Sequence, residues 1–148
     1  MKSAALAFLI ALTAATTAGA RPHSTFRVHA EANESSGPVF STTQKLFGRT
    51  VTIEKMATIS EQDVTALKTY RAADGTHGAL FQLSEHGRLA LDTVSVGRRG
   101  GRLYVFVNGR AVTELQIDRR VSDGKIYLPA GLTAKEAELL RKEWPARK

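Results

Sequence analysis

Five arginines in this sequence have the charge and the spacing to bind an anion. They flank two strand-like runs, residues 103–107 and 111–117, which an Asn-Gly pair joins. If that pair is a two-residue turn, the outer ends of the two runs come together at one end of a sheet. The arginines expected there are Arg98, Arg99, Arg102, Arg119 and Arg120. Two interpretations are open: a patch for an anion or an acidic partner, or a solvated rim that Asp118 and Asp123 partly neutralise.

Residues for nucleophilic or metal-assisted chemistry are scarce. The chain has no cysteine, and none of its serines lies in a G-x-S-x-G elbow. Its four histidines are not spaced like zinc ligands, so we expect them on the surface. They are His23, His29, His77 and His86. Acidic pairs such as Glu31 with Glu34 are more simply solvated charges. We therefore predict no catalytic residue, no cofactor and no metal site, and hence no enzyme.

The first twenty residues have the form of a cleavable export signal. Lys2 precedes an uncharged apolar run, residues 4–15, and residues 18–20 read Ala-Gly-Ala, the A-x-A form of a cleavage site. The run is shorter than the roughly 20 apolar residues that a transmembrane helix needs. We predict cleavage after Ala20, the alternative being an uncleaved anchor or a buried helix. Residues 21–148 would then form a bacterial protein in the periplasm or outside the cell.

The composition limits how the exported part can fold and associate. Without cysteine it has no disulfide and no lipid anchor, so it must fold on its core alone. The chain has 21 Lys and Arg against 14 Asp and Glu, a formal net charge of +7. This charge favours weak association with polyanions or anionic membrane surfaces. No nucleic-acid motif accompanies it, and we expect no specific nucleic-acid partner.

Residues 21–48 are predicted to hold one strand and a polar loop. Residues 26–30 alternate between apolar and polar side chains, which is typical of a strand with one wet face. A stretch rich in turn formers follows at residues 33–38, and it separates this segment from the better-patterned residues 49–148.

A strand over residues 49–57 and a helix over residues 60–74 are predicted next. Ser60 is a good N-cap with an acidic residue at the third helical position. Leu67 and Tyr70 form an i, i+3 pair that would face the core.

A second strand and helix follow at once. Residues 79–83 are an apolar run of strand length, and Ser84 is a suitable cap for the helix after it. Gly87 lies on the apolar face of that helix, where glycine costs roughly 1 kcal/mol relative to alanine. We expect the helix to pack closely on a sheet at Gly87.

The strongest local signal is the hairpin around Asn108-Gly109. This dipeptide accepts the positive φ angles of a type I′ turn, and Val107 should then pair with Arg110. Residues 103–107 are apolar on both faces, which indicates a central strand. An aromatic face left open for a partner would have the same pattern.

The C-terminal part is predicted to hold a short strand and a helix. The strand covers residues 125–128 and is closed by residues 129–131, and Thr133 with Glu136 forms a capping box for the helix. The order of elements predicts an α+β domain, with a mixed or antiparallel sheet and about three helices packed on one side.

Several segments, in this order, resemble the head subdomain of the first periplasmic domain of SecD, the accessory subunit of the bacterial Sec translocase. That family has a capped helix start before Asp-Val, a strand that ends at a Ser-x-x-Gly helix start, a strand with a tight turn, and a final Thr-x-x-Glu-Ala helix. The resemblance runs from Val51 to Trp144. The matching pieces are Ile59–Val64, Ala79–Gly87, Thr93, Val105–Gly109 and Leu132–Ala137.

The resemblance, which extends to the fused protein SecDF, implies a free-standing module of SecD-head type. Such a module would contact extended polypeptide or a partner in the cell envelope. It brings no catalytic residues. The sequence departs from the family in ending at Lys148 without a membrane bundle, in lacking the base subdomain, and in having Glu114-Leu115 where a proline is expected.

Two functional hypotheses from different classes remain. The first is a non-enzymatic binding or accessory module, and the second is an exported small enzyme or inhibitor with an unrecognised site. A cleft with converging titratable groups would favour the enzyme, whereas an open apolar sheet face or groove would favour the binding module.

Overall fold

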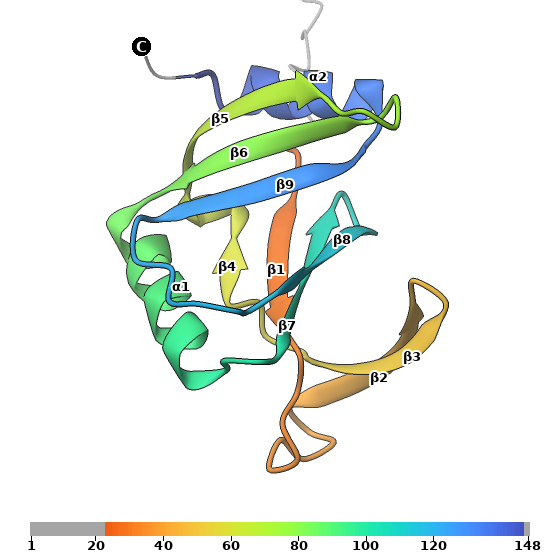
Figure 1. The fold of residues 1–148 in the computed structure, drawn as a ribbon, viewed down its shortest axis with the longest axis vertical. Helices are drawn as coiled ribbons and strands as arrows, with labels where there is room; N and C mark the ends of the chain where they lie inside the picture. Colours follow the sequence, from red (N-terminus) through yellow and green to blue (C-terminus); the bar gives the residue numbers. More distant parts are fainter. Residues whose placement is uncertain (1–22, 147–148) are drawn as a thin grey trace, which may run out of the picture.

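The computed structural model describes residues 23–146, so the predicted signal, residues 1–20, lies outside the described residues. The described chain forms three antiparallel sheets and two α-helices (Figure 1). The elements are β1 (Phe26–Ala30), β2 (Ser41–Leu46), β3 (Arg49–Glu54), β4 (Ile59–Ser60), the 3-10 turn η1 (Glu61–Asp63), β5 (Val64–Arg71), β6 (His77–Leu83), α1 (Glu85–Gly97), β7 (Arg102–Val107), β8 (Arg110–Gln116), β9 (Lys125–Leu132) and α2 (Ala134–Glu143).

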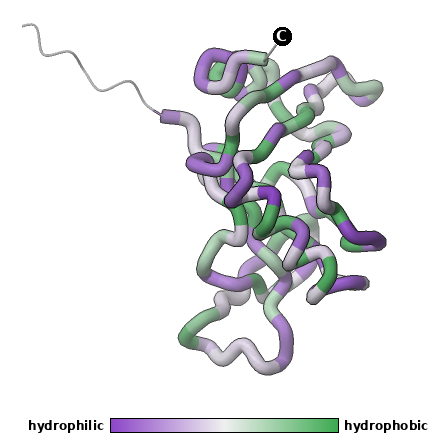
Figure 2. Tube along the Cα trace, turned by 90° about the vertical axis from the view of Figure 1, so that its left-hand side faces the viewer, coloured by the Kyte–Doolittle hydropathy of each residue, from purple (hydrophilic) through white to green (hydrophobic). Residues whose placement is uncertain are grey.

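The main core lies between two of these sheets. One has the strand order β4-β1-β7-β8, and the other has the order β5-β6-β9. Phe26 of the first sheet stacks on Phe81 of the second with ring centroids 4.1 Å apart. Hydrophobic and hydrophilic residues alternate along much of the chain (Figure 2), as two-layer packing of strands requires. Leu140 of α2 completes this core.

Strand β1 comes from the N-terminal segment, residues 21–48, and lies inside the first sheet. It pairs with β4 on one side and with β7 on the other. Phe26, Val28 and Ala30 are buried while the residues between them are not, which confirms the alternation predicted for this strand.

A two-stranded arm, β2–β3, extends from the main body (Figure 1) and has a small core of its own. Leu46, Val51 and Ile53 from the arm pack on Tyr104 of β7. Strand β7 therefore packs against a hydrophobic core on each of its two faces. It lies between β1 and β8, which confirms its predicted central position. Strand β2 was not expected, because residues 41–46 are mostly polar.

The helix predicted over residues 60–74 is wrong. Asp63 accepts a hydrogen bond from the Ser60 backbone at 2.9 Å, as a capping box requires, but it caps only the single turn η1. The chain then becomes strand β5, which pairs along its length with β6. Val64, Thr65 and Thr69 are β-branched, and they suit a pleated surface better than a helix.

The described residues therefore form two α-helices where about three were expected, and three antiparallel sheets where one sheet was expected. The α+β class is correct. The missing helix is the segment that β5 replaces, and pairing with β6 outweighs its local helical pattern because it buries Leu67 against the main core.

The other local predictions are confirmed. Val107 pairs with Arg110 across the Asn108-Gly109 turn. Thr133 accepts a hydrogen bond from the Glu136 backbone at 3.1 Å, and the Glu136 carboxylate accepts one from the Thr133 backbone at 2.8 Å. Strand β9, however, continues past its predicted end to Leu132.

Candidate functional site

The outer face of the β5-β6-β9 sheet, hereafter the outer face, is open to solvent. Leu67, Phe81 and Ile126 point into the core, and so their sequence neighbours point outward. The register aligns these outward residues in cross-strand rows, Ala66–Gln82–Lys125 and Lys68–Leu80–Tyr127. The face thus combines apolar side chains with a glutamine and two lysines; Ala66 is buried, whereas Lys68 and Tyr127 are exposed.

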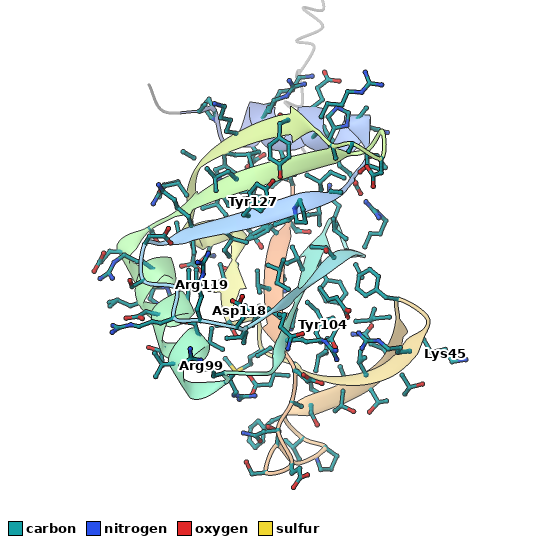
Figure 3. All side chains as sticks on the ribbon, viewed as in Figure 1. Lys45, Arg99, Tyr104, Asp118, Arg119 and Tyr127 are labelled. Carbon is teal, nitrogen blue, oxygen red and sulfur yellow. The ribbon has the colours of Figure 1, made fainter. Side chains whose placement is uncertain are left out.

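Two stacked tyrosines form one end of this face. The Tyr70 and Tyr127 rings lie 5.6 Å apart and 11° from parallel. Tyr70 crosses Gly78, where an added Cβ would lie 2.3 Å from the ring, and its hydroxyl donates to the Leu128 carbonyl. Burial raises the pKa of Tyr70, and Tyr127 raises it further, so its hydroxyl stays protonated. Tyr70 is thus fixed, and its ring stacks on that of Tyr127, which is 57% exposed and is labelled in Figure 3.

Two recesses flank Leu80 on the outer face. One, of about 310 Å³, is lined by residues of β5 and β6 and by Ala146. The other, of about 590 Å³, is lined by residues 118–123, Lys125 and Tyr127. The larger recess places Leu80 and Tyr127 beside one lysine, two arginines and two aspartates, so it suits a chain that carries both apolar and charged side chains.

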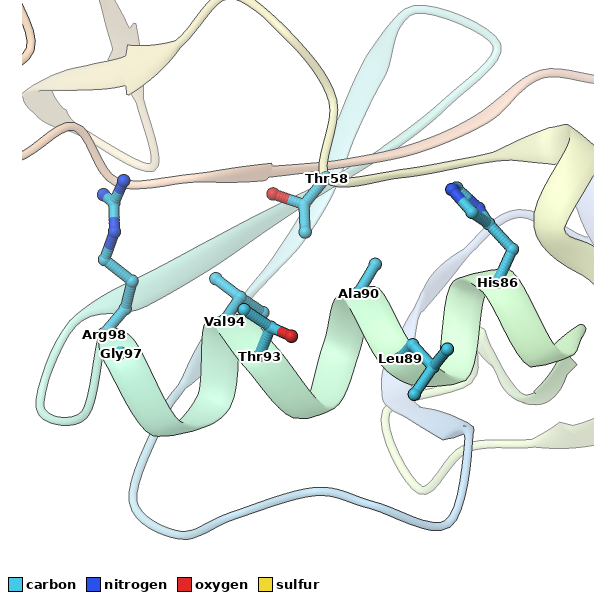
Figure 4. A pocket seen from close by; sticks show the side chains of 8 residues that line it. All are labelled: Thr58, His86, Leu89, Ala90, Thr93, Val94, Gly97 and Arg98. Carbon is cyan, nitrogen blue, oxygen red and sulfur yellow. The ribbon is translucent and has the colours of Figure 1, made fainter.

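A third recess, of about 500 Å³, runs along α1 (Figure 4). Leu89, Ala90 and Val94 give it an apolar floor, while His86 and Arg98 lie toward its two ends. Its lining is mostly apolar, and it provides a second groove for an apolar side chain.

The N-terminus of α1 is fixed beside this groove by Asp63. The buried Asp63 carboxylate lies 2.7 Å from His86 Nδ1 and also accepts the Ser60 backbone hydrogen bond. Gly87 makes this close approach feasible, because an added Cβ would lie 2.8 Å from Asp63 Cβ. Close packing at Gly87 is thus confirmed, but with η1 and Leu83.

The predicted arginine patch is divided in the structure. Arg98, Arg99 and Arg102 line a recess of about 220 Å³, whereas Arg119 and Arg120 border the outer face. Arg99 reaches the second group, since its Nε donates to the carbonyl of residue 118 at 3.3 Å (Figure 3).

Two of the five arginines hold the fold together. Arg98 binds the Glu54 carboxylate and the Glu31 carbonyl. Arg120 forms two hydrogen bonds with Asp92 of α1, at 2.5 and 2.7 Å, and they lower the pKa of that carboxyl. The other three, Arg99, Arg102 and Arg119, form no ion pair with a carboxylate among the described residues.

The expectation of surface histidines is only partly correct. His23 and His86 are exposed, but His29 is half-buried with its Nδ1 2.8 Å from the Glu54 carbonyl, and His77 is half-buried too. Within residues 23–146, no three His, Asp or Glu side chains gather as a metal-binding group.

The sequence does not reveal the outer face, because the spacing of Leu67 and Tyr70 predicts a helix with both side chains toward the core. The available signal was the alternation of exposed and buried residues around Tyr127, in which Lys125 and Tyr127 share the wet side.

The fold is similar to that of part of SecDF, although no family model and no curated protein matches the sequence. A solved structure of SecDF, described as a membrane component that enhances protein export, superposes with a TM-score of 0.58 at 14% identity. The superposition covers 84% of this chain and 65% of the SecDF chain. This chain therefore spans just under two thirds of the length of that SecDF chain. SecDF in its super-membrane-facing form gives a TM-score of 0.50 at 10% identity, over 83% of this chain and 29% of that one.

The resemblance to SecD is thus confirmed at the level of fold, and it covers more of the chain than the stretch from Val51 to Trp144. Neither helix of the described residues is long and apolar enough to cross a membrane.

Proposed function

We propose that this chain is an exported, non-enzymatic module that contacts polypeptide in an extended conformation. The observation that carries the proposal is the open outer face, with Leu80 and Tyr127 flanked by lysines. An unfolded chain offers apolar and charged side chains at short intervals, and such a mixed surface can bind both kinds.

The SecDF fold supports the same function. SecDF is described as enhancing protein export, and the export signal predicted for residues 1–20 would bring this chain to the compartment that exported polypeptides enter. The alternative, an exported enzyme or inhibitor, has no specific observation in its favour among residues 23–146.

Binding to an unfolded protein tests the proposal. We expect the purified protein to bind reduced, alkylated lactalbumin, an acidic chain that cannot refold, and not native lactalbumin, as measured by fluorescence anisotropy. Tyr127→Asp should weaken this binding at least about tenfold, because exposed aromatic side chains commonly dominate contact energies.

Val96→Asp is the matched control. Val96 on α1 is 59% exposed and Tyr127 is 57% exposed, so both variants place a carboxylate on an exposed apolar site. Equal affinities of the two variants would exclude the outer face as the binding site. Failure of the unmodified protein to bind the alkylated chain would reject the proposed function.

A further inference from the structure

Strand β2 has an unprotected outer edge. It is six residues long, pairs with β3 in a regular register, and contains no proline and a single charge, Lys45. Within residues 23–146, no strand pairs with its other side. The arm holds this edge away from the main body (Figure 1). Proteins normally protect such edges, because a row of free N–H and C=O groups readily accepts another strand.

The other sheet edges of the described chain are protected. Strand β4 has only two residues, and β5 has a bulge after Val64 and packs against α2. Strand β8 lies against β9, where Gly131 closely approaches the Val112 carbonyl, and β9 itself contains Pro129. The outer side of β3 is covered because the Thr52 carbonyl accepts the Ala32 N–H at 2.9 Å. Strand β2 alone has none of these protections.

The turn of the arm determines which groups of β2 are free. Phe47 and Gly48 have φ angles of 50° and 76°, as in a type I′ turn. Such a turn makes Leu46 and Arg49 a hydrogen-bonded pair. Hydrogen-bonded and non-hydrogen-bonded pairs then alternate along the two strands.

Thr43 and Lys45 therefore occupy non-hydrogen-bonded positions, and their N–H and C=O groups point away from β3. The Thr52 carbonyl supports this assignment, since Thr52 lies opposite Thr43 and its carbonyl binds Ala32, outside the arm. The free N–H and C=O groups of Thr43 and Lys45 belong to alternate residues, as expected along the edge of a strand that has no partner on one side.

We propose that the outer edge of β2 accepts a segment of extended polypeptide as an added β-strand. This inference rests on the proposed function, since the occupant is the same class of ligand, and it gives that ligand a second and directional contact. Backbone hydrogen bonds supply sequence-independent affinity, and side chains supply preference.

The chemistry around β2 defines the preferred segment. Lys45 favours an acidic residue opposite it, and the formal net charge of +7 favours an acidic chain in general. Phe40 and Phe47 are 68% and 46% exposed, and they lie just beyond the two ends of the strand, where they can contact apolar side chains.

A labelled nine-residue peptide of alternating valine and threonine with a central glutamate tests this inference with the full chain. We expect it to bind with protection of the Thr43 and Lys45 amides from hydrogen exchange. The same peptide with every backbone amide N-methylated has no N–H left on either edge and cannot pair as a strand, so it should bind at least about tenfold more weakly.

Two variants at one position separate the backbone from the side chain. Thr43→Pro removes an outward N–H without removing a bond to β3, and it should weaken peptide binding about tenfold or more. Thr43→Val keeps the N–H and the branched side chain, so its affinity should stay within about twofold of the original. Circular dichroism shows whether Thr43→Pro folds, and if it does not, the N-methylated peptide decides between pairing and no pairing.

Equal binding of the N-methylated peptide, or of folded Thr43→Pro, would overturn the inference. So would sedimentation that shows the protein pairing with its own copy through β2 while the peptide fails to bind. If alkylated lactalbumin binds in a Tyr127-dependent manner but Thr43→Pro has no effect, the proposed function stands and the edge site fails. If the alkylated chain does not bind at all, the proposed function itself fails.

Discussion

Replacing Gly87 by alanine tests the contact that positions α1. In an exposed helix the change would stabilise the protein by roughly 1 kcal/mol, from helix propensity alone. Here the new Cβ would lie 2.8 Å from Asp63 Cβ and 3.1 Å from Leu83 Cβ, closer than carbon atoms pack. Asp63 cannot easily move, because hydrogen bonds to Ser60 and His86 hold its carboxylate.

Forcing a methyl group into such a contact costs roughly 1–3 kcal/mol. With the propensity gain of about 1 kcal/mol subtracted, we expect Gly87→Ala to lower the free energy of unfolding by up to about 2 kcal/mol. For a domain of this size, the melting temperature should fall by up to about 8 °C. Urea and thermal denaturation followed by circular dichroism measure both quantities.

Gly97→Ala is the control on the same helix. A Cβ at Gly97 would have no atom within 4 Å, so this change should leave stability unchanged or raise it by up to about 1 kcal/mol. If Gly87→Ala is as stable as Gly97→Ala, then α1 does not approach η1 as described, and the groove along α1 loses its fixed end.

Three further predictions concern charge and burial. Burial opposes the charge on Glu136, but hydrogen bonds from Arg110 outweigh it and lower its pKa. Its contribution to stability is therefore present above the unfolded pKa of about 4.3 and is lost as the pH falls through the folded value, so Glu136→Gln should flatten the loss of stability in acid. Tyr104→Phe should leave the free energy of unfolding unchanged or raise it by up to about 1 kcal/mol, because the buried hydroxyl has no hydrogen-bond partner among the described residues. Charge reversal at Arg99 and Arg119 should reduce salt-sensitive binding to phosphatidylglycerol vesicles, since both side chains are exposed.

Each of these predictions has an outcome that contradicts it. Equal slopes of stability against pH for Glu136→Gln and the unmodified protein would mean that the Arg110 contact does not persist in solution. A clear loss of stability in Tyr104→Phe would show that the hydroxyl is bonded. Unchanged vesicle binding after reversal of Arg99 and Arg119 would reject the arginine patch.

The elements that the sequence predicted correctly are those whose signals are local. The Asn108-Gly109 turn and the Thr133 capping box each depend on a few adjacent residues that satisfy each other's backbone groups. Such signals operate in almost any tertiary context. The hairpin and both α-helices followed from them.

Residues 64–71 show where local reasoning fails. The spacing of Leu67 and Tyr70 fits a helix, yet the two side chains point to opposite faces of a strand, one to the core and one to Tyr127. Whether these residues form a helix or a strand depends on pairing with β6, and the local pattern contains no information about that partner. Strand β2 was missed for the complementary reason, since its apolar support comes from Tyr104, more than fifty residues away.

The outer face was beyond local prediction for a similar reason. The row Lys68–Leu80–Tyr127 exists only because two separate registers align three strands, and a shift of one residue in either would turn a side chain to the core. Alternation within β9 shows that Tyr127 is exposed, but it does not show which side chains lie beside it.

The arginines show how topology changes the meaning of charge. By sequence the five were equivalent members of one patch, whereas in the structure Arg98 and Arg120 are paired with Glu54 and Asp92. The net positive charge remains, so long-range attraction should speed encounter with any anionic chain, whatever its sequence. The lifetime of the complex must then come from short-range contacts. The apolar side chains of the outer face and the backbone edge of β2 are placed to supply them. High salt should consequently slow association more than it speeds dissociation.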